Sequence, residues 1–230
     1  MTDSGADAER LLRAEAEGCQ RCPQLASGRT QVVFASGPVD AEVMFIGEAP
    51  GASEDREGVP FVGASGRLLD QLLEGIELSR DDVYITNVLK CRPPENRDPR
   101  SDEIANCFSY LERQVEIVAP TVVVTLGNFS TKLLRADDTR ISKIRGQAEI
   151  CEIGSRTVWL LPVFHPAAAL YRRPNLELLS ADFKLLPELV GRGAPAQVDV
   201  AEPPPVLDPR PASTPVGDSD AEVRPQLDLF

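Results

Sequence analysis

The chain has 230 residues, of which 42% are hydrophobic, and a formal net charge of −12. A chain of this length can bury a full core, and no stretch approaches the roughly 18 consecutive apolar residues that suggest a membrane span. Residues 1–18 are acidic and contain no apolar segment of the signal-peptide type, so we expect a soluble cytoplasmic protein.

Most of the negative charge lies at the two ends of the chain. Eight of the twelve net negative charges fall in residues 1–18 and 195–230. Between them, basic residues still cluster, as they do around Lys90 and at Arg172 and Arg173. Because local patches govern contact with DNA, the acidic balance argues only weakly against a nucleic-acid partner.

In the body of the chain, strand patterns alternate with helical patterns. A buried strand over 42–47 precedes a helix over 64–76, and a strand over 82–87 precedes a helix over 101–118 with Ser101 as its N-cap. The remaining predicted elements are a strand over 121–127, a short helix over 128–135, a hairpin over 147–161 that turns at Gly154, a fourth core strand over 157–164 and a helix over 176–190. This alternation predicts an α/β fold with a parallel sheet covered by helices on both faces.

Polar and small residues follow each of the four core strands. The GEAPG stretch comes after the first strand, Asn87 ends the second, Gly127 and Asn128 follow the third, and His165 follows the fourth. His165 is also the only histidine of the chain. Because ligands bind at the carboxyl ends of parallel strands, we expect these residues to converge on one site.

Five cysteines are spread along the chain. Cys19 and Cys22 form a C-x-x-C pair in a loop, Cys91 follows the second strand and Cys107 lies on the next helix. Four thiolates from these regions suit zinc or an iron–sulfur cluster, and spacing alone does not choose between them. Cys107 as an ordinary buried residue is a further alternative. Cys151 alternates within a strand and is interpreted as a core thiol.

Three motifs together resemble the family 4, iron–sulfur uracil-DNA glycosylases. They are GEAPGASEDREGVPFVGASGRLLD, ITNVLKCRPPENRDP and HPAAAL, and the similarity runs from about Cys19 to Val190. The resemblance implies a three-layer α/β/α sandwich with a central four-stranded parallel sheet, in a glycosylase domain over 19–194 preceded by an acidic extension over 1–18. It also implies a [4Fe-4S] cluster on Cys19, Cys22, Cys91 and Cys107, with Cys151 left out.

A relative in this superfamily bonds covalently to the abasic sugar through a histidine in the loop after the second strand. The corresponding stretch here, KCRPPENRDP, has no histidine, and the first motif reads GEAPG where that relative has GEQPG. We therefore expect no covalent trapping. No lysine occupies a matching active-site motif either, so we expect no Schiff base and no lyase step.

Expelling uracil from an oxocarbenium-like sugar requires an extruded base and a donor at uracil O2. We expect His165, as a neutral imidazole, to supply that donor; a histidine that caps the loop through Pro166 is the alternative. Asn87 suits reading of uracil N3–H and O4, because an amide offers both a donor and an acceptor. An asparagine that ends a strand in a turn is the alternative interpretation.

The first motif supplies the other base-contacting candidates. Phe61 suits a platform under the flipped base, although a core phenylalanine gives the same pattern. Glu48 stands where the superfamily carries its water-handling residue, and either activates water or stabilises positive charge on the sugar. The backbone of Gly47 and Ala49 is expected to contact uracil, and Glu54 to crowd the C5 position against the methyl group of thymine.

The stretch after His165 is expected to form a DNA-binding loop over 168–171. Leu170 would fill the gap left by the flipped base, with Tyr171 beside it. Further phosphate contacts are expected from Arg172 and Arg173, and from backbone N–H groups near the start of the 64–76 helix at Gly63, Ser65 and Gly66.

Residues 195–230 hold eight of the 20 prolines and no aromatic residue before the last, a composition typical of a disordered tail. The tail ends in PQLDLF, whose Gln226, Leu227, Leu229 and Phe230 resemble the bacterial sliding-clamp-binding pentapeptide. We expect this end to bind the clamp; a frayed terminus with incidental apolar residues is the alternative.

The resemblance implies a monomeric, monofunctional DNA glycosylase of base excision repair, associated with the nucleoid. Its substrate would be uracil in single- and double-stranded DNA. One alternative is a catalytically weak iron–sulfur module that binds damaged DNA and is tethered to the clamp. Another is an iron–sulfur redox protein in which the α/β body is only a scaffold, which leaves the strand-end residues unexplained.

Overall fold

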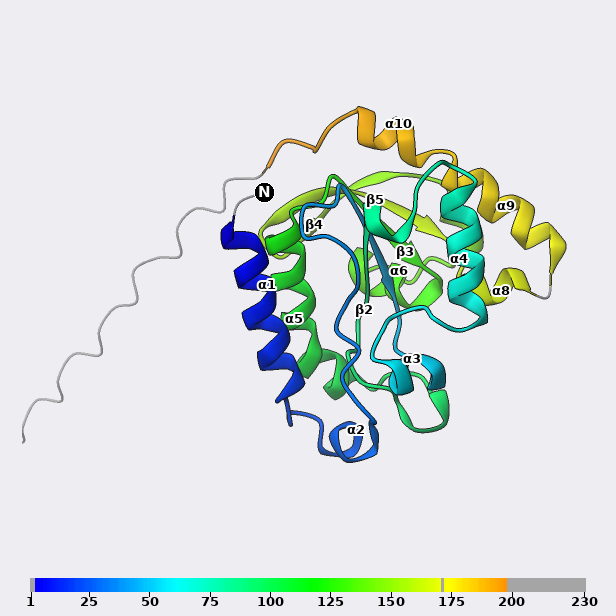
Figure 1. The fold of residues 1–230 in the computed structure, drawn as a ribbon. Helices are drawn as coiled ribbons and strands as arrows, with labels where there is room; N and C mark the ends of the chain where they lie inside the picture. The colour runs from blue at the N-terminus through cyan, green and yellow to red at the C-terminus, as the bar shows by residue number, and fades with distance from the viewer. Residues whose placement is uncertain (1–2, 171, 198–230) are drawn as a thin grey trace, which may run out of the picture. The chain divides into compact units, whose positions relative to one another are not determined.

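The computed structural model describes residues 3–170 and 172–197, and these form a sheet with helices on both faces (Figure 1). Four strands are parallel and lie in the order β2 (Val83–Asn87), β1 (Val43–Gly47), β3 (Val122–Leu126) and β5 (Arg156–Val163). The predicted four-stranded parallel core is confirmed. A fifth strand, β4 (Glu149–Ile153), pairs antiparallel with β5, because a turn at Gly154 returns the chain directly along it.

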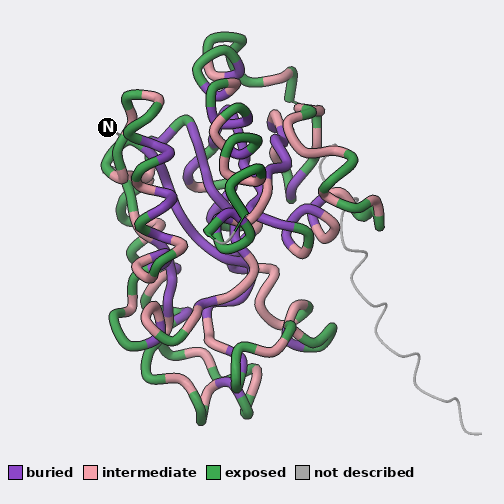
Figure 2. Tube along the Cα trace, turned by 90° about the vertical axis from the view of Figure 1, so that its right-hand side faces the viewer, coloured by how far each residue is buried: buried purple, intermediate pink, exposed green. Residues whose placement is uncertain are grey.

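Alternate residues of each strand face two separate hydrophobic cores. Phe45 belongs to one core and its neighbour Met44 to the other. The first core is closed by α4 (Ala64–Glu74), α9 (Arg173–Phe183) and α10 (Leu186–Gly191), and the second by α1 (Asp3–Glu17), α5 (Ser101–Val118) and α6 (Asn128–Arg135). This arrangement is the predicted three-layer sandwich, and the strands form its buried centre in Figure 2.

The shorter elements lie in the connections between these layers. They are α2 (Pro23–Gly28), α3 (Ala52–Glu57), the 3₁₀ turns η1 (Arg80–Asp82) and η2 (Pro94–Asn96), α7 (Ile141–Ile144) and α8 (Pro166–Leu170). None of the described helices is both long enough and apolar enough to cross a membrane.

Two details of the predicted helices are wrong. The N-cap of α5 is Arg100 rather than Ser101, because the carboxylate of Glu103 accepts the Arg100 N–H at 2.9 Å and begins the helix one residue earlier. The single helix predicted over 176–190 is divided into α9 and α10. Pro187, which has no N–H to continue a helix, stands in the first turn of α10.

The acidic segment at the N-terminus packs into the body of the fold. Its helix α1 lies beside α5, and its Leu12 and Ala16 side chains are buried in the second core. The prediction of an extension over 1–18 did not anticipate this packing. All described residues belong to one compact unit. Of the tail predicted over 195–230, residues 198–230, including the clamp-like end, lie outside the described residues, whereas Gln197 exchanges hydrogen bonds with the main chain of Thr157 at 3.0 and 2.9 Å.

Candidate active site

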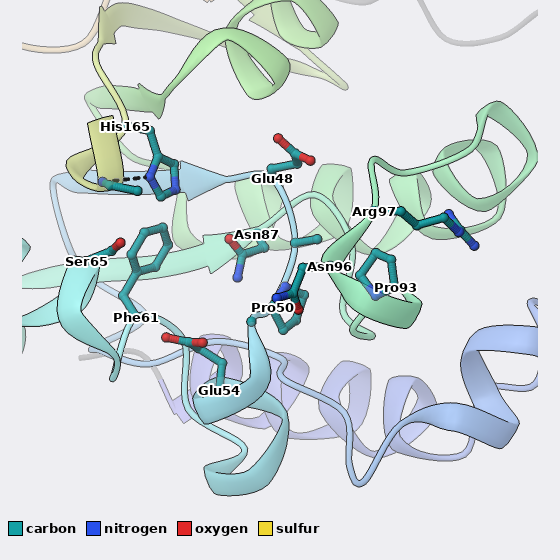
Figure 3. Close-up of a pocket in the computed structure, with 13 residues that line it drawn as sticks. Glu48, Pro50, Glu54, Phe61, Ser65, Asn87, Pro93, Asn96, Arg97 and His165 are labelled. Carbon is teal, nitrogen blue, oxygen red and sulfur yellow. Dashed lines mark hydrogen bonds between the residues drawn. The ribbon is translucent and has the colours of Figure 1, made fainter. Parts of the chain in front are cut away.

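The carboxyl ends of the parallel strands open onto a cavity of about 410 Å³. Figure 3 shows side chains from the loops after β1, β2 and β5 around one space, as the strand-end pattern predicted. Its lining consists of Glu48, Ala49, Pro50, Gly51, Glu54, Phe61, Ser65, Asn87, Pro93, Asn96, Arg97, His165 and Ala167. The cavity therefore brings together the predicted catalytic residues and most of the predicted base-contacting residues.

Asn87 presents an unpaired amide to this cavity. Its residue is only 2% exposed, and its Oδ1 has no hydrogen-bond partner in the described protein. A Cβ atom on Gly47 would lie 2.3 Å from that Oδ1 and 2.6 Å from Cζ of Phe61. Glycine is therefore required at position 47, because any side chain would fill the space between the amide and the ring.

Phe61 is held in an uncommon backbone conformation by its neighbours. Its φ is +55°, and the Glu54 carboxylate accepts the N–H groups of Val62 and Gly63, both at 3.0 Å. The Arg80 guanidinium donates to the Phe61 carbonyl from the other side. Glu54 thus supports the loop that carries the ring, and its expected exclusion of the thymine methyl group stays a prediction.

His165 is arranged as a neutral hydrogen-bond donor. Its Nδ1 accepts the N–H of Ala167 at 3.1 Å, and its ring centroid lies 5.7 Å from that of Phe61. Burial lowers the pKa of His165 from 6.5 to about 4. The imidazole is therefore neutral at neutral pH, and because Nδ1 accepts a hydrogen bond, Nε2 carries the proton and can donate it.

Glu48 stands between this cavity and a second one of about 540 Å³. Both cavities are lined by Glu48 and His165, and the second also by Asp98, Asn128 and Lys132. Burial raises the pKa of the Glu48 carboxyl, and the nearby Asp98 carboxylate raises it further. A carboxyl group with a raised pKa at this junction suits proton transfer with a water molecule.

The loop after β2 supplies lining residues that the sequence did not single out. Pro93, Asn96 and Arg97 border the first cavity. The Arg97 guanidinium is held by two hydrogen bonds to Glu103, at 2.9 and 2.6 Å, and this partner lowers the pKa of Glu103 to about 2. The available sequence signal was the PPEN turn, which marked a loop without indicating that its side chains face the site.

The prediction of a loop over 168–171 is wrong, because most of this segment is helical. Residues 166–170 form α8, because Pro166 starts the helix and the alanines that follow favour it. Leu170 lies at its end and is 38% exposed, Arg172 and Arg173 are exposed, and Tyr171 lies outside the described residues.

The phosphate-binding candidates near the 64–76 helix lie at its start. Gly63 is the N-cap of α4, and Ser65 and Gly66 belong to its first turn. Ser65 also lines the cavity. Gly66 is buried against the Phe61 carbonyl, where a Cβ atom would lie only 1.6 Å from the oxygen. Close packing of the helix on the Phe61 loop therefore requires glycine at position 66.

Four of the cysteines surround a narrow internal cavity of about 20 Å³. They are Cys19, Cys22, Cys91 and Cys107, while Cys151 lies apart on β4. Three N–H groups donate to these sulfur atoms: Arg29 Nη1 to Cys91 at 3.2 Å, the Lys90 main chain to Cys107 at 3.4 Å and Asn106 Nδ2 to Cys22 at 3.6 Å.

The thiols of this cavity are partly buried. Among residues 3–170 and 172–197, no group of three or more histidine, cysteine, aspartate or glutamate side chains is arranged to hold a metal ion. Burial raises the pKa of the Cys22, Cys91 and Cys107 thiols, to about 11 for Cys107. Arg29 opposes this rise at Cys91, because its positive charge favours the thiolate.

Comparison with known proteins agrees with this geometry. The family model described as the uracil DNA glycosylase superfamily matches residues 34–186. A type-4 uracil-DNA glycosylase of Sulfurisphaera tokodaii is 46% identical over 80% of this chain and 85% of its own length. Type-4 enzymes of Archaeoglobus fulgidus (44% identical, 80% of this chain, 94% of the relative) and Thermotoga maritima (43%, 72% and 84%) are also similar. The chain belongs to the uracil DNA glycosylase superfamily, in the type-4 group that its three motifs indicate.

Proposed function

We propose that this chain excises uracil from DNA by hydrolysing the N-glycosidic bond, which leaves an abasic site. One observation carries the proposal: the cavity that holds the unpaired Asn87 amide also holds the neutral donor His165 and the ring of Phe61. A flipped base needs a reader, a leaving-group donor and a stacking surface in one place.

The Asn87 amide reads the base. Its Oδ1 accepts uracil N3–H and its Nδ2 donates to O4, while the base stacks on Phe61. Cytosine presents an acceptor at N3 and an amino donor on C4. Asn87 Oδ1 would then face an acceptor and Nδ2 would face a donor, so neither hydrogen bond forms and cytosine is rejected. The backbone at Gly47 and Ala49 borders the base, and Glu54 fixes the loop beneath it.

His165 stabilises the departing uracil anion. Its Nε2–H donates to O2 as negative charge develops there, and a preorganised donor in a water-poor cavity needs no rearrangement during the reaction. Glu48 orients or deprotonates the water that attacks the sugar. The proposed reaction is monofunctional, with water as the nucleophile.

The four cysteines Cys19, Cys22, Cys91 and Cys107 hold a [4Fe-4S] cluster in this proposal. Their common cavity and the three N–H donors to sulfur support it, because such donors are typical around cluster thiolates. When bound, the cluster supplies thiolate bonds that cross-link three regions of the chain. A colourless protein that contains zinc and no iron after anaerobic purification would contradict this assignment.

The DNA duplex lies across the mouth of the cavity. Leu170 fills the gap left by the flipped nucleotide, with Tyr171 beside it, and Arg172 and Arg173 contact phosphates. Backbone N–H groups at Ser65 and Gly66 hold a further phosphate.

The enzyme acts as a monomer in the cytoplasm, at the nucleoid, and its C-terminal residues bind the sliding clamp. Deletion of 226–230 tests the clamp proposal, and unchanged clamp affinity in the shortened chain would contradict it.

The activity itself is tested with uracil placed in single-stranded and in duplex DNA. Incubation followed by alkali should produce strand scission at the uracil position, with free uracil released. Absence of scission on both substrates, with binding retained, would favour the catalytically weak DNA-damage-binding module instead.

A further inference from the structure

Lys90 is fully buried between the uracil site and the cysteine cavity, and no step of the reaction uses it. The residue is 2% exposed, and its Nζ lies 2.7 Å from Thr86 Oγ1, 2.5 Å from Gln114 Oε1 and 2.6 Å from the main-chain carbonyl oxygen of Asn87. The side chain thus folds back along its own segment to reach the residue that ends β2.

All three partners of this amine are hydrogen-bond acceptors. The Thr86 hydroxyl donates its own proton to the Phe34 carbonyl at 2.7 Å. The amide nitrogen of Gln114 donates to Tyr84 and Phe34, which leaves Gln114 Oε1 as an acceptor. Lys90 Nζ is therefore the donor in all three contacts, including the one to the Asn87 carbonyl oxygen.

A buried amino group is costly unless it makes specific interactions. Among the described residues no carboxylate hydrogen-bonds to Lys90, so a structural salt bridge does not account for it. Apolar side chains fill cores at lower cost. The contact that distinguishes Lys90 is the one to the Asn87 carbonyl, because it joins a rigid core group to the residue that faces the base.

The Asn87 side chain depends on this backbone contact. Its Oδ1 has no protein partner, so no hydrogen bond from the site holds the amide oxygen in place before uracil binds. The rotamers open to the Asn87 side chain depend on the backbone dihedral angles of Asn87. A hydrogen bond to the Asn87 carbonyl oxygen fixes the peptide plane that follows Asn87, and so restricts those angles. Lys90 is itself fixed to α5, through its N–H to Cys107 and through Gln114.

We propose that Lys90 is a positioning residue that orients the base-reading amide of Asn87 by holding its main-chain carbonyl. The inference rests on the proposed role of Asn87. It assigns Lys90 no proton transfer and no bond to the sugar. Its consequence is that uracil affinity and excision depend on a side chain that never touches the substrate.

A double-mutant cycle between Lys90→Met and Asn87→Ala tests the proposal. Methionine removes the amino group but keeps an unbranched side chain that is only one atom shorter, and it keeps the main-chain N–H to Cys107. Lys90→Met alone should lower kcat/KM on uracil DNA by about 10- to 100-fold and weaken inhibition by free uracil. In the Asn87→Ala background the same change should cost less than about threefold, because no amide remains to be positioned.

Thr86→Val is the matched control. It removes one member of the same buried network but leaves the Lys90 contact to the Asn87 carbonyl, so it should destabilise the protein while uracil affinity stays near that of the wild type. Iron content and the visible spectrum check that the cysteine site is unaffected. If Lys90→Met does not fold, Lys90→Met with Gln114→Met removes the unpaired acceptor and serves in its place.

The outcomes separate the two proposals. Fully additive losses in the cycle overturn the positioning role of Lys90, since they mean that it acts independently of Asn87. Full activity of Asn87→Ala overturns the base-reading role of Asn87, and the inference about Lys90 with it.

Discussion

His165 is a neutral group in the folded protein, and its surroundings explain why. An imidazolium would need an acceptor at Nδ1–H, yet Nδ1 faces the N–H of Ala167 at 3.1 Å. Burial lowers the pKa to about 4 for the same reason that it disfavours any isolated charge. In the proposed reaction, the fixed Nε2–H meets negative charge only as the base departs, which is the condition for transition-state stabilisation.

Replacing His165 with asparagine should preserve the fold and remove most of the activity. The shorter amide cannot place a donor where the Nε2–H stood, so single-turnover excision should slow by about 10²- to 10³-fold. Circular dichroism and melting at pH 7.5 check the fold. Excision at the wild-type rate in this variant would show that the uracil anion is stabilised by another group.

The same substitution changes how stability depends on pH. Because the folded-state pKa of His165 lies near 4 and the ordinary value is 6.5, the unfolded chain binds a proton that the folded chain does not. The contribution of neutral His165 is complete above pH 6.5 and is lost as the pH falls towards 4. The melting temperature of the wild type should therefore drop more steeply across this window than that of His165→Asn.

Asp98 contributes, after burial, to the raised pKa of Glu48. Its negative charge adds to burial in raising the pKa of Glu48. Asp98→Asn should therefore lower that pKa and move the acidic limb of the kcat/KM profile to lower pH. Asp102→Asn, which removes an exposed carboxylate that does not affect the pKa of Glu48, is the control. Equal profiles for wild type and Asp98→Asn would mean that the limb belongs to another group.

The strands and the place of the site follow from the sequence because their physical signals are local. Uninterrupted apolar runs mark buried parallel strands, and the residue after each run necessarily lies at the same edge of the sheet. Asn87 and His165 could be placed in one cavity on this basis. The positions of Pro93, Asn96 and Arg97 could not be predicted in this way. Their loop is oriented by two hydrogen bonds from Arg97 to Glu103, and such side-chain contacts leave no local signal in the sequence.

Helix α1 shows where composition misleads. Five acidic residues dominate segment 1–18, yet Leu12 and Ala16 are spaced by four and face α5. Asp7, Glu15 and Glu17 are exposed, while Glu9 is partly buried and accepts hydrogen bonds from Arg13 and Tyr84. A small apolar stripe is sufficient to bind the helix to the core. Similarly, three alanines after Pro166 favour a helix over the expected loop.

A pair of adjacent leucines tests whether α1 is an integral part of the fold. Leu12 is 0% exposed and Leu11 is 63% exposed. Leu12→Ala should lower the free energy of unfolding by about 2–5 kcal/mol, whereas Leu11→Ala should change it by less than about 0.5 kcal/mol. Denaturant titration measures both. Equal, small effects would show that the helix is only loosely attached.

At the scale of the whole molecule, the cysteine cavity joins regions that are distant in sequence. Cys19 and Cys22 lie between α1 and α2, Cys91 follows β2, and Cys107 is on α5. Arg29 links two of these regions directly, since it donates to Cys91 Sγ at 3.2 Å and to the Cys19 carbonyl at 2.9 Å. In the proposed cluster site, a cation here also offsets the negative charge of several thiolates in a buried space.

Loss of Arg29 should therefore weaken retention of the proposed cluster before it affects the fold. Arg29→Gln should lose visible absorbance and iron several-fold faster than wild type when exposed to a chelator in air. Arg21→Gln is the matched control, because Arg21 borders the same cavity but donates to the Asn106 carbonyl and the Ser109 hydroxyl instead of to sulfur. Equal rates of loss in the two variants would show that Arg29 is a surface residue without influence on the cluster. Faster loss in Arg29→Gln alone would show that Arg29 holds the N-terminal segment to the loop after β2. Asn87 ends this same strand, so the contact lies close in sequence to the residue that faces the uracil cavity.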